Sequence, residues 1–209
     1  MLKKVYYKLP YIVQNYLNKA ASRISNNSIE EFIYSDIGKN YNLNYKDKIK
    51  IIKRIQDAFS KIESATSLEV QVELGKKILS LDEKSEDFIV ECGSFKGASS
   101  VALSIFSKTV NRKLIIYDSF EGLPYDNDEI EGRNYPHLQV TGNYKKGMYK
   151  GSLEEVEKNL KFFGEFENCI LRKGEFKNIL KDHKEKIDFL FLDVDLVMST
   201  LDCIKHLWP

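Results

Sequence analysis

The chain has 209 residues, of which 43% are hydrophobic and 30% are charged, a composition typical of a soluble globular protein with a sizeable core. Its 32 basic and 31 acidic side chains give a formal net charge of +1, which argues against a nucleic acid as the main partner. Cys92, Cys169 and Cys203 are widely spaced and form neither a CxxC zinc motif nor a paired disulfide framework. We therefore expect a reducing, cytoplasmic location.

Residues 1–66 are predicted to form a helical N-terminal extension, because they show no strand pattern. Residues 1–23 have an apolar and a basic face, and we expect them to pack on the domain or on a second subunit of a homo-oligomer. A helix on a membrane surface is the alternative. The apolar run is broken by polar residues, which argues against a signal peptide or a membrane span. Residues 25–45 are polar and rich in asparagine, as in a loop, and residues 47–62 have helical spacing.

Residues 67–209 are predicted to form the main domain, which is of the α/β class. A helix over residues 67–81 has Ser67 as its cap. Short apolar runs predict strands at 88–92, 113–117, 169–172 and 187–192, and helices are predicted at 99–108, 152–163, 176–183 and 199–207. Continuous apolar strands that alternate with helices indicate a parallel sheet with helices on both faces.

The turn after the first of these strands, "ECGSFKG", is a candidate ligand site, since ligands bind beyond the carboxyl ends of parallel strands. Gly93 allows a sharp bend and a close approach to a ligand, and Gly97 allows the next helix to pack tightly. The G-x-x-x-G spacing lacks the middle glycine of the dinucleotide-binding G-x-G-x-x-G turn. By itself, the pattern fits a strand-to-helix connection without a ligand about equally well.

The second strand ends at Asp118, 21 residues after Gly97. A carboxylate at this place can accept hydrogen bonds from both hydroxyls of a ribose. A lone aspartate at a strand end is usually a helix cap or a solvated turn residue. Combined with the glycine turn upstream, Asp118 favours a nucleoside ligand.

Two acids, Asp193 and Asp195, follow the fourth apolar run in "FLFLDVDL". A charge next to a buried strand is costly, and alternation along an extended chain puts both acids on one face. Two oxygen ligands close together suit Mg²⁺ or a similar divalent cation. The alternative is that one acid caps the following helix and the other is solvated. Asp195 is also a candidate for a residue that supports the metal ligands without binding the metal itself.

The sequence resembles the macrocin O-methyltransferase family through "VECGSFKGASS", "DSFEGLP", "KKGMYKGSLEEVEKNL", "KGEF" and "FLDVDL", which occur in the same order. The resemblance extends from about residue 67 to residue 209. It implies a Rossmann-like class I methyltransferase sheet and an S-adenosylmethionine-dependent enzyme that methylates a hydroxyl of a sugar or related small molecule with a divalent cation. "DSFEGLP" and "LDVDL" are specific to this family, whereas the glycine turn is not.

The same resemblance implies roles for individual residues. The methionine end of the cofactor would contact Glu91, Gly93, Ser94 and Gly97. The ribose and its surroundings would contact Asp118, Ser119 and Phe120, and the adenine would contact Gly174 and Phe176. Asp193, with Asp195, would bind the metal. Residues 123–151 would cover the acceptor, with Tyr125, Tyr135, Tyr144 and Tyr149 as stacking faces. His137 would be the catalytic base, although a histidine in an exposed loop is more often solvated.

Two departures from the family pattern lead to further expectations. The sequence stops after "IKHLWP", where family members continue with a Gly-Gly turn and a further acidic strand, so we expect a fragment that is poorly stable and inactive in isolation. With strand order 3-2-1-4, the fourth strand would be an exposed apolar edge. Val197 and Met198 also differ from the aromatic and small residues expected there. A non-catalytic S-adenosylmethionine-binding or nucleoside-binding subunit and an NAD-dependent oxidoreductase remain as alternatives.

Overall fold

The structure is a computed structural model, and it describes residues 28–126 and 144–208. Four strands form one parallel sheet in the order β3-β2-β1-β4. Their bounds are Phe88–Cys92 for β1, Leu114–Asp118 for β2, Cys169–Lys173 for β3 and Ile187–Leu192 for β4. The α/β class, the four parallel strands and their order are as predicted, and each strand lies within one residue of its predicted position.

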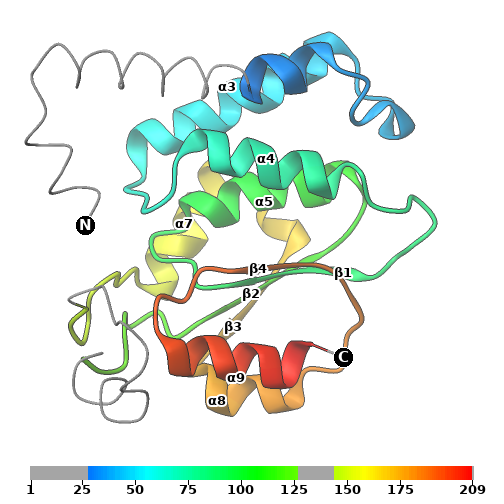
Figure 1. The fold of residues 1–209 in the computed structure, drawn as a ribbon. Coiled ribbons are helices and arrows are strands. Elements are labelled where there is room, and N and C mark those ends of the chain that lie inside the picture. Colours follow the sequence, from blue (N-terminus) through cyan, green and yellow to red (C-terminus); the bar gives the residue numbers. More distant parts are fainter. Residues whose placement is uncertain (1–27, 127–143, 209) are drawn as a thin grey trace, which may run out of the picture.

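Helices cover both faces of the sheet (Figure 1). One face carries α3 (Tyr45–Lys61), α4 (Leu68–Ile78), α5 (Ala98–Thr109) and α7 (Leu153–Phe163), and the other carries α8 (Phe176–Ile179) and α9 (Val197–Leu207). Short 3-10 turns at Phe166–Asn168 and Leu180–Asp182 precede β3 and follow α8. No helix in the described ranges combines the length and hydropathy needed to cross a lipid bilayer.

The side chains of the central strands alternate between two buried layers. Ile89 and Leu114 belong to the larger cluster under α3, α4 and α5, whereas Val90 and Ile115 belong to the cluster under α8 and α9. Burial on both faces explains why β1 and β2 are continuous apolar runs. In contrast, every residue of β4 is only half-buried, because β4 pairs with β1 on one side and forms one edge of the described sheet.

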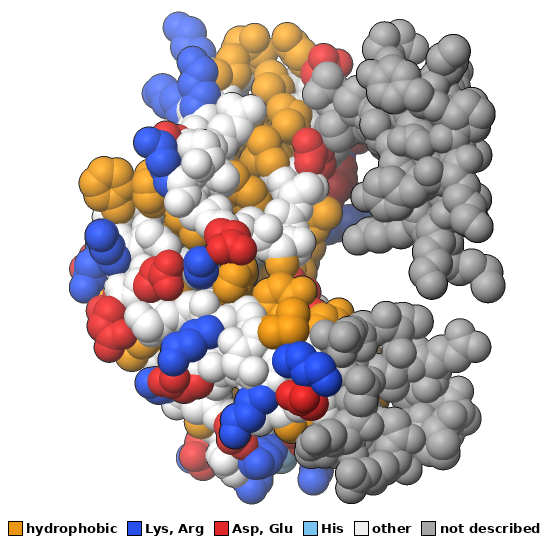
Figure 2. All heavy atoms as spheres, turned by 90° about the vertical axis from the view of Figure 1, so that its left-hand side faces the viewer, with side chains coloured by type: hydrophobic (Ala, Val, Ile, Leu, Met, Phe, Trp, Pro, Cys, Tyr) orange, Lys and Arg blue, Asp and Glu red, His pale blue; other side chains and the backbone are white. Residues whose placement is uncertain are grey.

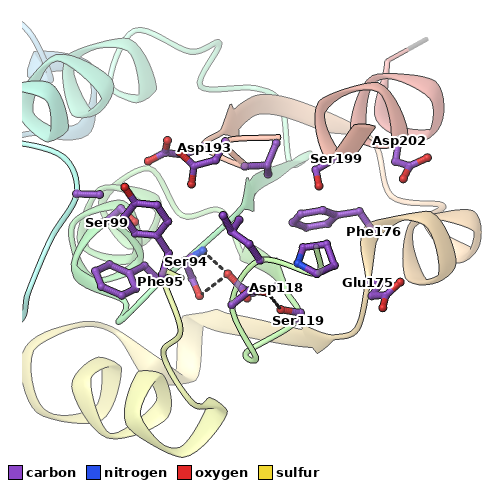
Figure 3. A pocket seen from close by; sticks show the side chains of 18 of the residues that line it. Ser94, Phe95, Ser99, Asp118, Ser119, Glu175, Phe176, Asp193, Ser199 and Asp202 are labelled. Atoms are coloured by element: carbon purple, nitrogen blue, oxygen red, sulfur yellow. Dashed lines mark hydrogen bonds between the residues drawn. The ribbon is translucent and has the colours of Figure 1, made fainter. Parts of the chain in front are cut away.

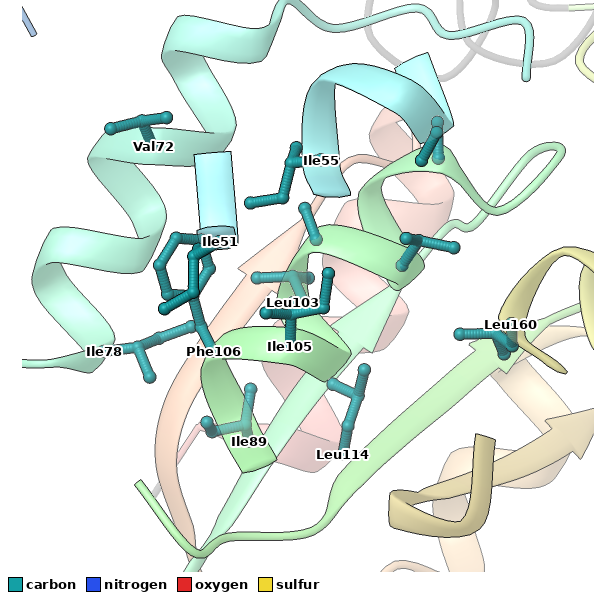
Figure 4. Close-up of a cluster of buried hydrophobic side chains, with 14 of the residues drawn as sticks. Ile51, Ile55, Val72, Ile78, Ile89, Leu103, Ile105, Phe106, Leu114 and Leu160 are labelled. Atoms are coloured by element: carbon teal, nitrogen blue, oxygen red, sulfur yellow. The ribbon is translucent and has the colours of Figure 1, made fainter. Parts of the chain in front are cut away.

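The N-terminal helices pack directly on α5. The first turn of α3 is held by a capping box between Asn44 and Asp47, and Ser67 caps α4 as predicted. Ile51 and Ile55 of α3 meet Phe106 of α5 in the core (Figure 4). The predicted division of the chain into residues 1–66 and 67–209 stays a prediction.

The prediction of a loop over residues 25–45 is wrong for part of this range. Residues 28–34 are helical, and a 3-10 turn follows at Lys39–Tyr41. Phe32 is fully buried and meets Phe106 edge-to-face at a centroid distance of 6.0 Å. One buried aromatic side chain therefore fixes a helix in a segment whose polar composition is typical of a loop.

Candidate functional site

A cavity of about 450 Å³ lies beyond the carboxyl ends of β1, β2, β3 and β4. It opens where the sheet reverses its winding between β1 and β4, the usual place for a ligand in such folds. Its walls come from residues 63–66, 93–95, 98–99, 118–119, 122–125, 174–177, 193–195, 198–199 and 202, with Tyr149. Figure 2 views the molecule from the side toward which the strands point, and charged side chains of both signs are interspersed over that face.

The glycine turn brings the ends of β1 and β4 together. Gly93 has a φ of +91°, and a Cβ atom there would lie 2.1 Å from the carbonyl oxygen of Asp193. Gly97 has a φ of +87° and precedes α5, where a Cβ atom would lie 3.2 Å from the Cγ1 atom of Val156 in α7. Gly93 is thus required by the close approach of the chain after β4, and Gly97 by the left-handed backbone at the start of α5.

The Asp118 carboxylate fixes the shape of this turn. Its Oδ2 atom accepts hydrogen bonds from the Ser94 amide at 2.6 Å and the Ser94 hydroxyl at 3.2 Å, and its Oδ1 atom accepts from the Phe120 amide at 2.7 Å. Burial raises the pKa of Asp118 above the ordinary aspartate value, and the hydrogen bonds act in the opposite direction. Gly93 and Asp118 line the same cavity, which is the convergence that the sequence predicted. The ribose contact of Asp118 stays a prediction.

Glu91 lies behind the cavity wall and does not itself line the cavity. It is fully buried and accepts hydrogen bonds from the hydroxyls of Ser99, at 2.6 Å, and Ser100. Burial raises the pKa of Glu91 to about 8, although both serine hydrogen bonds lower it. Ser99 does line the cavity, so Glu91 can influence a ligand through the orientation of the Ser99 hydroxyl.

An aromatic ring lies at the far end of the cavity. Figure 3 shows Phe176 near Ser199 and Asp202, at the end opposite Phe95 and Ser99. The predicted residues Gly174 and Ser119 also line the cavity, whereas Phe120 is only 1% exposed and packs in the core. The ring of Phe176 and the open backbone at Gly174 can accept a flat heterocycle.

Asp193 and Asp195 are both exposed and line the cavity, whereas Val194 and Leu196 are buried, so the two acids lie on one side as predicted. The prediction of an extended chain is wrong here, because β4 ends at Leu192 and Asp195 has a φ of +58°. Partial burial raises the pKa of both carboxyls. The neighbouring Tyr144 hydroxyl acts in the opposite direction and lowers the pKa of Asp195.

These two acids do not make a complete metal site by themselves. Within residues 28–126 and 144–208, no three histidine, cysteine, aspartate or glutamate side chains are grouped to hold a metal ion. A divalent cation normally takes six or more oxygen ligands, several from the protein. The metal-binding role of Asp193 and Asp195 therefore stays a prediction.

Aromatic side chains gather at the mouth of the cavity. The Phe95 and Tyr149 rings meet edge-to-face at 5.6 Å, and Tyr144 and Tyr149 lie 6.2 Å apart. Tyr125 and Tyr149 line the cavity directly. Two predicted residues of this insert, Tyr135 and the candidate base His137, lie outside the described residues.

Several cavity residues were not predicted from the sequence. Ser99 lies two residues after Gly97, and this spacing could have indicated it. Ser199 and Asp202 reach the cavity through the docking of α9 on the sheet, and residues 63–66 reach it through the docking of the N-terminal helices. Such contacts are long-range in sequence and have no local signal.

Three solved structures are similar to this chain. The O-methyltransferase NovP superposes with a TM-score of 0.49 at 19% identity, over 79% of this chain and 60% of NovP. CalS11, a calicheamicin methyltransferase, gives a TM-score of 0.50 at 13% identity, over 78% of this chain and 73% of CalS11. The SAH-bound Podospora anserina methyltransferase PaMTH1 gives 0.45 at 14% identity, over 75% and 56% of the respective chains.

The chain thus spans 60% of the length of NovP. No curated protein sequence matches it. The family model described as macrocin-O-methyltransferase (TylF) matches residues 77–209, which include all four strands and every predicted cofactor and metal residue. The chain therefore belongs to the macrocin O-methyltransferase family.

Proposed function

We propose that this chain binds S-adenosylmethionine and directs its methyl group to a hydroxyl oxygen of a sugar or related small molecule. The observation that carries the proposal is the cavity of about 450 Å³ between the glycine turn and Asp118, inside the region that matches the macrocin O-methyltransferase family. Pockets of about 300 to 1,000 Å³ are typical for drug-sized ligands and cofactors.

The chemistry of the cavity walls fits the two ends of the cofactor. The Phe176 ring suits the adenine, and the opposite end at Ser99 suits the amino-acid part (Figure 3). The Ser99 hydroxyl donates to Glu91, so its lone pairs remain for an ammonium group. The α5 helix begins without a side-chain cap, and its first amides suit a carboxylate.

When bound, S-adenosylmethionine supplies a methyl group that its sulfonium already activates for direct displacement. The chain then has to hold the cofactor, align the acceptor oxygen with the methyl group and limit access of water. The turn fixed by Asp118 holds the cofactor. The rings of Phe95, Tyr144 and Tyr149 give an acceptor ring a surface on which to stack.

The acceptor side of the proposal rests on fewer described residues. Asp193 and Asp195 face the cavity, where they can accept hydrogen bonds from acceptor hydroxyls or contribute to a site for Mg²⁺ or a similar cation. His137 is proposed as the base that takes the hydroxyl proton. The identity of the acceptor hydroxyl depends on the insert that contains His137.

The proposed compartment is the reducing cytoplasm, which agrees with the free thiols of Cys92, Cys169 and Cys203. Homo-oligomer formation through the apolar face of residues 1–23 is part of the same proposal. A static light-scattering measurement of the chain with and without residues 1–23 tests this second point.

Isothermal calorimetry with S-adenosylmethionine, S-adenosylhomocysteine and NAD tests the cofactor. We expect heat with the first two and none with NAD; heat with NAD alone would favour the oxidoreductase alternative. Transfer of a labelled methyl group to a panel of sugars, with and without Mg²⁺, then tests turnover. Cofactor binding without transfer to any acceptor would favour the non-catalytic subunit.

A further inference from the structure

The connection between α3 and α4 forms one wall of the cavity although it precedes the part of the chain that matches the family. Residues 63–66 line the cavity, whereas the family match begins at residue 77. Lys96 of the glycine turn holds this connection in place, because its Nζ atom lies 2.6 Å from the Glu63 Oε2 atom. The N-terminal layer is therefore tied to the turn on which the proposed cofactor site depends.

The connection is also ordered by its own hydrogen bonds. The Ser64 hydroxyl donates to the Thr66 carbonyl oxygen at 2.9 Å and accepts from the Thr66 amide at 3.2 Å. The fully buried Gln71 donates its Nε2 proton to the Thr66 hydroxyl at 2.9 Å. These contacts give residues 63–66 a defined shape, so that Glu63 is presented at a fixed place on the rim.

The charges on this rim are complementary to an amino acid. Glu63 and Lys96 offer a carboxylate and an ammonium group side by side, and 68% of the Glu63 side chain stays exposed and open to a second cation. Glu63 lines the cavity, and the Lys96 Nζ atom lies 5.4 Å from the centroid of the Phe95 ring, so the pair lies beside Phe95, at the end of the cavity opposite Phe176. An α-ammonium and an α-carboxylate on one carbon atom match this pair, with each group next to its opposite charge.

We propose that residues 63–66 complete the amino-acid end of the S-adenosylmethionine site, with the Glu63 carboxylate receiving the α-ammonium group of the cofactor. This rests on the proposed function and assigns a binding role to a segment before the family match. The neighbouring Lys96 keeps Glu63 in place and offers its own charge to the α-carboxylate. The N-terminal helices then contribute to cofactor binding as well as to the core.

Two ligands that differ only at this end separate the proposal from a structural effect. S-adenosylhomocysteine carries the amino acid, whereas 5′-methylthioadenosine lacks it. We expect Glu63→Gln to weaken S-adenosylhomocysteine binding about tenfold, the loss of one charge-assisted hydrogen bond, and to leave 5′-methylthioadenosine binding unchanged in calorimetry. Glu165→Gln is the matched control, because it breaks the Arg54–Glu165 ion pair of 2.9 Å, which also joins α3 to the core but lies outside the cavity lining.

Unchanged S-adenosylhomocysteine affinity in Glu63→Gln would overturn the proposal. An equal loss for both ligands would do the same, since it would place the effect of Glu63 on the fold of the site. A wild-type chain that binds neither ligand would overturn the proposed function itself. Binding of both by the wild type, with selective loss of S-adenosylhomocysteine only in Glu63→Gln, supports the assignment.

Discussion

The two walls of the cavity are built in different ways. The wall after β1 and β2 is tied together internally, since the Asp118 carboxylate accepts three hydrogen bonds from Ser94 and Phe120. The wall after β4 presents Asp193 and Asp195 openly to the cavity. The first wall is a preformed cradle whose carboxylate is already hydrogen-bonded to the backbone, and the second presents two carboxylates that can accept hydrogen bonds from a ligand.

This difference follows from the position of the strands in the sheet. β1 and β2 are central and buried on both faces, so a carboxyl group near their ends must be hydrogen-bonded, as it is at Asp118 and at Glu91. β4 is half-buried at one edge, where carboxylates are less costly. A cofactor of constant shape suits the first wall, and a variable acceptor suits the second.

The largest loss of folding stability is expected from a side chain that is introduced between the two walls. Gly93→Ala puts a Cβ atom 2.1 Å from the Asp193 carbonyl oxygen and forces alanine into a φ of +91°. We expect it to lower the free energy of unfolding by about 3 kcal/mol or more, measured by denaturant titration.

Gly147→Ala is the matched control for that substitution. Gly147 has a similar φ of +80°, but a Cβ atom there would meet nothing within 4 Å. Only the cost of a left-handed alanine, about 1 kcal/mol, is expected. Equal losses in the two variants would show that the approach of the chain after β4 to Gly93 is not a tight constraint.

A smaller loss is expected from the cradle itself. Asp118→Ala leaves the Ser94 and Phe120 amides without their acceptor, which should cost about 2 kcal/mol of folding free energy. It should also abolish S-adenosylhomocysteine binding in calorimetry, because the glycine turn loses its shape. Wild-type cofactor affinity in this variant would contradict both the cradle and the proposed cofactor.

The first wall was largely predictable from the sequence, because its features are local. Strands buried on both faces are continuous apolar runs, and the glycine turn and Asp118 stand directly at strand ends. The strand order brings these ends together, so their convergence on one cavity follows. Phe120 shows the limit of this argument, since it follows the site residues in sequence but packs in the core.

The second wall and the N-terminal side were less predictable, because packing decides them. Asp195 has a left-handed backbone in the short link between β4 and α9, which strand alternation cannot indicate. The helix at residues 28–34 depends on the burial of Phe32 against α5, and residues 63–66 depend on the contact of Glu63 with Lys96. Each of these contacts joins residues far apart in the sequence.

A pH dependence of the folding free energy is expected from Glu91. Its pKa is raised from 4.5 to about 8 in the folded chain, so the folded state holds a proton that the unfolded state releases between these values. The wild type should therefore lose stability as the pH rises through this window, by about 1 kcal/mol per pH unit. Glu91→Gln keeps a neutral group and should lack this part of the dependence.

Thermal unfolding of both proteins from pH 5 to pH 8 measures this prediction. Asp118, Asp193 and Asp195 also have raised pKa values, but they are present in both proteins, so the difference between the two curves isolates Glu91. Parallel curves would mean that Glu91 is ionised throughout the folded state.

The smallest effect on cofactor binding is expected at the second wall. Asp193→Asn and Asp195→Asn keep the size of each side chain and touch none of the hydrogen bonds of the cradle, so S-adenosylhomocysteine affinity should change by less than about threefold, which corresponds to under 1 kcal/mol. Methyl transfer should fall instead, together with any stimulation by added Mg²⁺, because these acids face the acceptor side. Calorimetry and a labelled-methyl assay on the same preparations separate the two quantities. A large loss of cofactor affinity in either variant would show that the two walls act as one site, and the division between a cofactor wall and an acceptor wall would have to be abandoned.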